Sequence, residues 1–295
     1  MDVEMKIQEP INRVTRKQKL KNYSKHPGSF LLALLTKLAI LLTVLALGFI
    51  LIYILVKGIP NLSTDLFALK YTTENVSMLP AIINTLIITL LSLCIAGPIG
   101  VFSAIYLVEY AKKGNKLVEV VRVTAETLTG IPSIVYGLFG MLFFVTTLKC
   151  GYSLLAGALT LSIMVLPVIM RTTEEALLAV PNSFRDGSFG LGAGKLRTKF
   201  KIVLPSAVPG ILAGVILAIG RMVGETAALI YTAGTVAEIP SSIMSSGRTL
   251  AIHMYSLSKE GLYTDQAYAT AVVLLIVVVL INMLSNFVAK KFTKK

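Results

Sequence analysis

The sequence predicts an all-α membrane protein whose chain crosses the bilayer as six helices. Only 15% of its 295 residues are charged and 55% are hydrophobic, and its mean hydropathy is +0.78. A soluble domain carries roughly a quarter charged residues. Apolar runs of helix-spanning length recur along the chain, whereas the strands of a membrane barrel are short and alternate in polarity. The composition therefore favours a helical, polytopic membrane protein.

Six apolar stretches mark the expected spans. The first follows a basic segment at 1–30 and is too long for the core of a signal peptide, so we expect it to be a retained helix. The expected spans lie at 31–56, 79–108, 117–148, 154–170, 207–233 and 268–289. The polar connections between them include 57–78, 110–116, 171–204 and 234–267, and a basic tail follows at 290–295.

The distribution of basic residues predicts the orientation. An even number of spans puts both termini on one side, and 20 of the 28 Lys and Arg residues fall in the segments of that side. The other side has five, namely Lys57, Lys70, Lys149, Arg248 and Lys259. By the positive-inside rule both termini are cytoplasmic. Since this rule accounts for the net charge of +13, no nucleic-acid partner is expected.

The third expected span contains a cluster of helix-weakening residues, Gly130-Ile131-Pro132-Ser133. This cluster predicts either a proline kink used in packing or a broken helix that protein or a water-filled cavity covers. Earlier in the same span Arg122 and Glu126 stand one helical turn apart, near its cytoplasmic end. We expect this pair to stabilise a helix bundle, with a role in a polar pathway as the alternative.

The fifth expected span carries Arg221 and Glu225 near its centre. Exposing either charge to lipid there costs about 2.5–3.5 kcal/mol even on the lenient insertion scale, so both side chains must face protein or a polar pathway. Their spacing of four residues allows them to pair with each other. A pathway for an anion and a purely structural ion pair are both compatible with this pattern.

The polar segment 171–204 contains a predicted amphipathic helix. Ser183 has the position of an N-cap, and Asp186, three residues on, can complete a capping box. Apolar side chains then recur at helical spacing and form one stripe, and Pro205 closes the segment at the membrane. The residues of this stripe are Phe189, Ala193, Leu196 and Phe200. The stripe favours docking on a partner protein, and a helix lying on the lipid headgroups is the alternative.

The same segment resembles the Glu-Ala-Ala loop of bacterial ABC-importer permeases. Gly192 is followed after nine residues by Ile202-Val203-Leu204-Pro205, as in that loop, and Asp186-Gly187-Ser188 stands where those proteins have Glu-Ala-Ala. The resemblance implies a short coupling helix, within 181–205, that docks into a cleft of a cytoplasmic ATPase subunit.

A second resemblance narrows the family. Arg221-Met222-Val223-Gly224-Glu225-Thr226-Ala227, the run from Gly130 to Gly140, and Glu175-Ala176-Leu177 are similar to phosphate-transport permeases over residues 75–287. The chain looks more like the PstA subunit of that system than PstC. The resemblance implies the type I, MetI-like permease fold in the plasma membrane of a bacterium or archaeon.

The resemblance also implies a function and partners. The chain would form half of a pathway for inorganic phosphate, beside a second permease resembling PstC, an ATPase resembling PstB and an extracytoplasmic binding protein resembling PstS. Arg221, Glu225, Thr226 and Ser133 would line the pathway. Guanidinium suits this task because its planar donor fork matches phosphate oxygens.

Other functions are less compatible with the sequence. It has no Gly-x-x-x-x-Gly-Lys-Ser/Thr motif, so we expect ATP hydrolysis on a separate chain and no enzymatic activity here. Two histidines and two cysteines without clustering predict no metal site or cofactor. A permease for sulfate, molybdate or phosphonate is the first alternative, and a secondary transporter is the second. An intramembrane hydrolase lacks its catalytic motifs.

Overall fold

The computed structural model describes residues 27–112 and 114–293. Most of the basic segment 1–30 and the end of the basic tail 290–295 therefore lie outside the described residues. The chain divides into two compact units, Met1–Ile54 and Leu55–Lys295. Helix α2 (Pro27–Gly58) supplies the described part of the first unit. Its side chains are apolar around the whole helix, as expected of a helix that crosses a membrane.

The second unit is built of helices, and its described residues contain no strand. In chain order these are the 3₁₀ turns η1 (Ile59–Asn61) and η2 (Thr64–Phe67), α3 (Leu79–Ile105) with the π-helical η3 (Tyr106–Tyr110), α4 (Lys116–Thr129), α5 (Ser133–Gly140) with the π-helical η4 (Met141–Thr147), α6 (Leu154–Leu178), α7 (Asn182–Gly190), α8 (Lys195–Thr198) with the π-helical η5 (Lys199–Val203), α9 (Leu204–Val223), α10 (Ala227–Ile230), α11 (Leu250–Glu260) and α12 (Thr264–Thr293).

Five described helices are long and apolar enough to cross a membrane. They confirm the prediction of a helical polytopic protein, but the third expected span is not one straight helix. Lys116–Thr129 and Ser133–Thr147 meet at a bend of 104°, and they make a sixth span only if the bent pair is counted as one. Pro132 disfavours helical backbone at Ile131 and has no N–H to donate. The cluster is therefore a helix break, and the kink interpretation is wrong.

Several predicted boundaries also move. Helix α6 does not end at Arg171 but continues for two turns to Leu178, where charged side chains form ion pairs. The connection 234–267 contains helix α11 in addition to loops. The expected fifth span ends early, because α9 stops at Val223 and the short α10 begins only at Ala227. Local hydropathy does not predict these helix boundaries, because they depend on tertiary partners.

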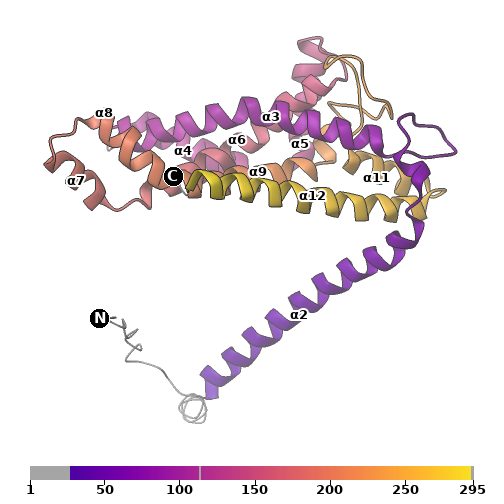
Figure 1. The fold of residues 1–295 in the computed structure, drawn as a ribbon, viewed down its shortest axis with the longest axis horizontal. Coiled ribbons are helices and arrows are strands. Elements are labelled where there is room, and N and C mark those ends of the chain that lie inside the picture. The colour runs from indigo at the N-terminus through magenta and orange to yellow at the C-terminus, as the bar shows by residue number, and fades with distance from the viewer. Residues whose placement is uncertain (1–26, 113, 294–295) are drawn as a thin grey trace, which may run out of the picture. The chain divides into compact units, whose positions relative to one another are not determined.

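Helix α6 forms the centre of the second unit. Its side chains Leu161, Met164 and Ile169 are at most 1% exposed. They belong to one apolar cluster with Ile88 of α3 and Met222 of α9. In Figure 1, α3, α6, α9 and α12 run side by side along this unit. The core thus depends on helices that are far apart in sequence.

Helices α5 and α10 approach each other closely because α5 lacks side chains at the contact. A Cβ added to Gly137 would lie 2.9 Å from Cα of Ala228, and one added to Gly140 would meet Thr160 and lie 2.7 Å from Cγ2 of Thr232. Only glycine leaves room for this contact. The contact packs α5, which follows the helix break at 130–132, against α10, which follows a second helix break at 224–226.

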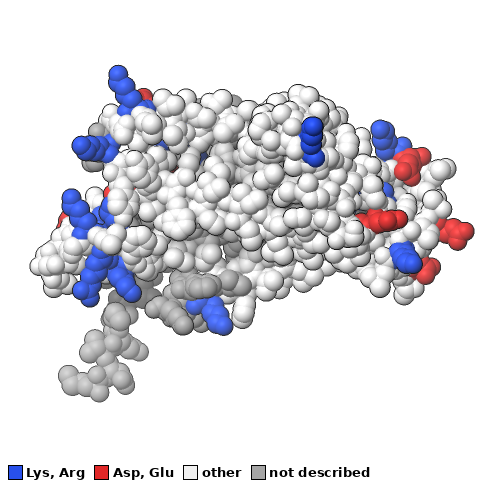
Figure 2. All heavy atoms as spheres, turned by 90° about the horizontal axis from the view of Figure 1, so that it is seen from above, with Lys and Arg blue, Asp and Glu red and all other residues white. Residues whose placement is uncertain are grey.

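Charged side chains are segregated along the second unit. Figure 2 shows a wide middle region that is almost free of charge, with blue Lys and Arg spheres gathered at the end that carries α7 and α8. Most of the red Asp and Glu spheres on this face lie at the opposite end. An apolar belt between two charged ends is the distribution that a bilayer requires.

The α5–α10 contact makes a test of the fold possible. We expect Gly137→Ala to lower the free energy of unfolding by about 1–3 kcal/mol, because the new methyl group overpacks a backbone contact. Thermal unfolding of the purified chain in detergent measures the change. Gly220→Ala is the matched control, since a Cβ there meets no atom within 4 Å. Equal melting temperatures for the two variants would contradict this account of the contact.

Candidate functional site

Arg221 lies in the last turn of α9, directly before the break at 224–226. Its side chain is partly exposed, and it forms no hydrogen bond or ion pair with any residue that the structure describes. The break that follows it leads into α10, which packs against α5 through Gly137 and Ala228. The structure thus places an unpaired guanidinium beside the junction of two broken helices.

Glu225 does not pair with Arg221, which corrects one of the two sequence interpretations. Its carboxylate Oε1 accepts a hydrogen bond of 3.1 Å from the backbone N–H of Ala228, and the residue is 9% exposed. This bond stabilises the start of α10, whose first amides would otherwise lack partners. The spacing of four residues favours a pair only on a continuous helix, and the helix ends between the two residues.

Thr226 and Ser133 belong to the two segments that the α5–α10 contact brings together. The Thr226 carbonyl accepts a bond of 3.1 Å from the N–H of Ile230. Ser133 is the first residue of α5 and stands one turn before Gly137. At the first break, the Tyr136 hydroxyl donates a 2.7 Å hydrogen bond to the carbonyl of Leu128. Both breaks therefore have specific partners for their backbone groups.

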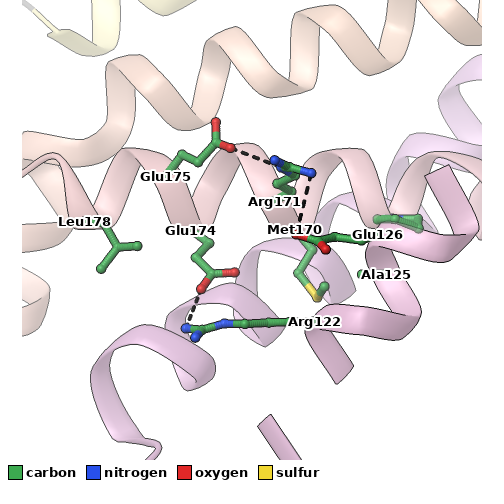
Figure 3. Close-up of a pocket in the computed structure, with 9 residues that line it drawn as sticks. Arg122, Ala125, Glu126, Met170, Arg171, Glu174, Glu175 and Leu178 are labelled. Atoms are coloured by element: carbon green, nitrogen blue, oxygen red, sulfur yellow. Dashed lines mark hydrogen bonds and ion pairs between the residues drawn. The ribbon is translucent and has the colours of Figure 1, made fainter. Parts of the chain in front are cut away.

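A second group of charges joins α4 to α6 (Figure 3). Arg122 pairs with Glu174 at 2.5 Å, whereas Glu126 faces Arg171 at 3.8 Å. Arg171 also pairs with Glu175 at 3.1 Å, one turn along α6. The sequence had suggested that Arg122 and Glu126 pair with each other. They do not, because α6 offers each of them an opposite charge.

These side chains surround a pocket of about 250 Å³. Two arginines and three glutamates line it, together with Pro167 and Met170. Sequence reasoning missed Arg171, Glu174 and Glu175 as members of a site. Their spacing of three and four residues near the end of an apolar stretch was the available signal.

The segment between α6 and α9 is a helical hairpin, which we call the α7–α8 turn (residues 182–198). Gly192 has φ +79° and ends α7 with the support of an N–H bond to the carbonyl of Phe189. Glycine adopts this left-handed backbone without strain. Leu191, at the tip, is 91% exposed. The predicted single helix with one apolar stripe is therefore wrong, because the chain reverses between Phe189 and Leu196.

Two further predictions for this segment need correction. Ser183 is not an N-cap, since α7 begins at Asn182 after Pro181 and has no side-chain cap. Pro205 does not close the segment, because the helix continues through it from η5 into α9. As a result, α8, η5 and α9 form one helix, Lys195–Val223.

The residues that resemble the Glu-Ala-Ala loop lie around this turn. Asp186 and Gly187 are exposed on α7, and the hydroxyl of Ser188 bonds that of Thr198 across the turn at 2.9 Å. A groove of about 430 Å³ includes Gly187, Ser188, Gly192 and Ile202. Leu204 and Pro205 lie outside it on α9.

Glu109 attaches the α7–α8 turn to the end of α3. Its carboxylate accepts a 2.8 Å bond from Arg185 and lies 3.9 Å from Nζ of Lys199, with its side chain only 9% exposed. Arg185 also donates to the carbonyls of Val180 and Leu177, at 2.9 and 3.2 Å. Lys199 lies 3.5 Å above the ring of Tyr110. No local sequence pattern predicts the role of Glu109, because its partners are 76 and 90 residues away.

The chain belongs to a family of transporter membrane subunits. The family described as "Binding-protein-dependent transport system inner membrane component" matches residues 96–295. Among solved structures, a bacterial alginate ABC transporter has a TM-score of 0.65 at 16% identity, covering 92% of this chain and 98% of that chain. The inward-facing MetNI methionine ABC transporter has a TM-score of 0.56 at 21% identity, covering 73% and 94%. These confirm the MetI-like fold.

Closer relatives confirm the resemblance to phosphate-transport permeases. The phosphate transport system permease protein PstA of Pasteurella multocida (strain Pm70) is 35% identical over 269 residues, which cover 87% of this chain and 92% of that protein. PstA of Haemophilus influenzae is 30% identical over 273 residues, covering 91% and 96%. The probable ABC transporter permease YqgI of Bacillus subtilis (strain 168) is 32% identical over 261 residues, covering 82% and 88%.

The α4–α6 ion pairs are testable by double-mutant cycles. We expect Arg122→Gln and Glu174→Gln to show a coupling of about 0.5–1 kcal/mol, since the pair is only partly exposed. Thermal unfolding of the two single variants and the double variant gives the value. The matched cycle of Arg122→Gln with Glu126→Gln should give a coupling near zero. A larger coupling in this second cycle would restore the pairing expected from sequence.

Proposed function

We propose that this chain is a membrane-spanning permease subunit of an ATP-driven phosphate importer and forms half of its translocation pathway. One observation carries the proposal: Arg221 presents an unpaired guanidinium at the meeting point of two broken helices. The names of the PstA relatives support phosphate as the substrate. An unpaired charge at membrane depth is costly, so a position of this kind favours a role in a polar pathway over packing.

The chemistry of Arg221 fits transient anion binding. Guanidinium stays charged in a low dielectric and offers paired N–H donors to two phosphate oxygens. Because the Glu225 carboxylate is held by the amide of Ala228, Arg221 stays available to an anion. Thr226 and Ser133 would add hydroxyl groups nearby. A pathway needs contacts weak enough for release, and a single arginine supplied by one half meets this requirement.

The α7–α8 turn supports coupling to a separate ATPase subunit. Glu109 fixes the base of the turn through Arg185 and Lys199, while Leu191 extends from its tip. From Lys195 the helix runs without a break to Val223, about 40 Å at 1.5 Å per residue. A displacement of the turn would therefore be carried along one continuous helix to the surroundings of Arg221.

The proposed assembly follows from this division of tasks. A second permease resembling PstC would complete the pathway, an ATPase resembling PstB would bind the α7–α8 turn, and an extracytoplasmic protein resembling PstS would deliver phosphate. The gathering of basic side chains at the α7–α8 end supports a cytoplasmic location for that end. In Figure 1 the C-terminal end of α12 lies at the same end, which supports a cytoplasmic C-terminus.

The first test concerns the substrate pathway. We expect Arg221→Gln to lower phosphate uptake by about tenfold or more, since a lost charge-assisted bidentate contact corresponds to at least 1.5 kcal/mol. Assembly of the complex should be unchanged. Uptake of labelled phosphate into cells or proteoliposomes, with sulfate and molybdate as competitors, measures the effect and the specificity.

Lys259→Gln is the control for this test, because it removes one positive charge from an exposed position on α11. Normal phosphate uptake by Arg221→Gln would assign Arg221 to packing. Stronger competition by sulfate or molybdate than by unlabelled phosphate would replace phosphate with that oxyanion as the substrate.

The second test concerns the ATPase. Leu191→Asp should weaken retention of the ATPase on the purified permease by about tenfold, because it puts a charge into a docked apolar contact. Leu262→Asp is the matched control: Leu262 is 82% exposed and lies beside α11, at the opposite end. Co-purification measures both. Loss of the ATPase in the control, with retention in Leu191→Asp, would refute this assignment of the turn.

A further inference from the structure

A buried polar cluster lies at the end of the second unit opposite α7 and α8, where α11 begins (Figure 1). Arg248 is 6% exposed and His253 is fully buried. Neither Nε nor Nη2 of Arg248 has a hydrogen-bond partner among the described residues. Both ring nitrogens of His253 also lack a partner at normal geometry, although the backbone of Val76 lies close. Donors left unpaired in this way are rare in folded proteins.

The guanidinium of Arg248 is covered by an aromatic ring but not neutralised. It lies 4.5 Å from the ring centroid of Tyr71, and the same ring meets His253 edge-on at 6.2 Å. Cation–π contact compensates only part of the loss of hydration. Among the ion pairs that the described residues form, none includes Arg248. A buried cation without a counter-ion is strongly unfavourable, so this arrangement stores free energy that an anion would release.

The surroundings of Arg248 add further positive potential. It stands directly before Thr249, whose hydroxyl caps the N-terminus of the eleven-residue helix α11. The partial positive charge of a helix N-terminus favours anions. Burial, and secondly the charge of Arg248, lower the pKa of His253 to about 3. His253 is therefore neutral at physiological pH and retains one N–H donor.

The cover over this cluster belongs to a strained segment. Val76 has φ +46° and is 1% exposed, an unusual backbone for a β-branched residue. Hydrogen bonds between Thr72 and Asn75 hold the turn that precedes it, at 2.9 and 3.1 Å. Tyr71 lies at the start of this turn. The side chain of Tyr71 is itself partly exposed and forms ring contacts but no side-chain hydrogen bond with the described residues, so its ring can rotate off Arg248 while this turn stays in place.

We infer that Arg248 and His253 form an oxyanion-binding site, separate from Arg221, which Tyr71 covers in this structure and uncovers when the anion binds. The ligand class is a small tetrahedral oxyanion, with inorganic phosphate as the probe. The Nε and Nη2 edge of the guanidinium matches two oxygens of such an ion, and His253 lines the cluster against the same Tyr71 ring. This inference rests on the proposed function, which makes this the end where the anion enters.

The test uses the purified permease complex without the binding protein, in the Arg221→Gln background, so that the pathway arginine does not contribute. We expect phosphate to raise the melting temperature of this parent, and Arg248→Gln to abolish the rise. Without phosphate, Arg248→Gln should melt at a higher temperature than the parent, because it removes an uncompensated buried charge. A purely structural arginine would give the opposite change.

Two more variants sharpen the result. Tyr71→Ala should lower the half-saturating phosphate concentration by about tenfold, since no cover has to open. Lys259→Gln, at an exposed position of α11, should leave it unchanged. Stabilisation by phosphate that survives Arg248→Gln would overturn the site. So would an Arg248→Gln variant that loses only its binding to the extracytoplasmic protein, because a carboxylate of that partner would then be the counter-ion.

The same measurements separate this inference from the proposed function. If sulfate or molybdate stabilises the parent where phosphate does not, and Arg248→Gln abolishes that effect, the site holds and the substrate of the importer is revised. If no oxyanion acts through Arg248 while phosphate uptake still depends on Arg221, the proposed function holds and the site is overturned.

Discussion

The contact between α5 and α10 is the interaction on which the architecture depends. In an apolar environment a chain can leave its helix only where other groups satisfy and cover the freed backbone. The two breaks of this protein meet that condition together. The hydroxyl of Tyr136 bonds the carbonyl of Leu128 at the first, and the carboxylate of Glu225 bonds the amide of Ala228 at the second. Gly137 allows the two segments to pack.

This contact also explains why Arg221 is free. A continuous helix would have placed Glu225 one turn away as its partner, which is the favourable geometry for an ion pair. Because the helix breaks, the Glu225 carboxylate instead accepts a hydrogen bond from the backbone N–H of Ala228. The guanidinium of Arg221 then has no partner among the described residues. Within the same five residues, 221–225, the break therefore supplies a cap for α10 and leaves the guanidinium of Arg221 unpaired among the described residues.

The charges of the second unit divide into pairs that fix helices and cations that stay available. Glu109 holds Arg185 and Lys199, and α6 supplies partners to Arg122 and Glu126. Arg221 and Arg248 have no acidic partner in the described part of the chain. A paired charge adds rigidity but attracts no further anion, whereas an unpaired guanidinium in a low dielectric attracts one strongly.

The sequence by itself determined the helical membrane class, the family and the position of the α7–α8 turn, because hydropathy, basic-residue asymmetry and short motifs are local properties. Only the tertiary structure decided the 104° bend, the reversal at Gly192 and the partners of the charged residues. Arg122 shows the reason: Glu126 is its neighbour by helical spacing, yet Glu174 is its partner, because α6 packs against α4. Which helices pack together depends on the whole chain, and no local pattern encodes it.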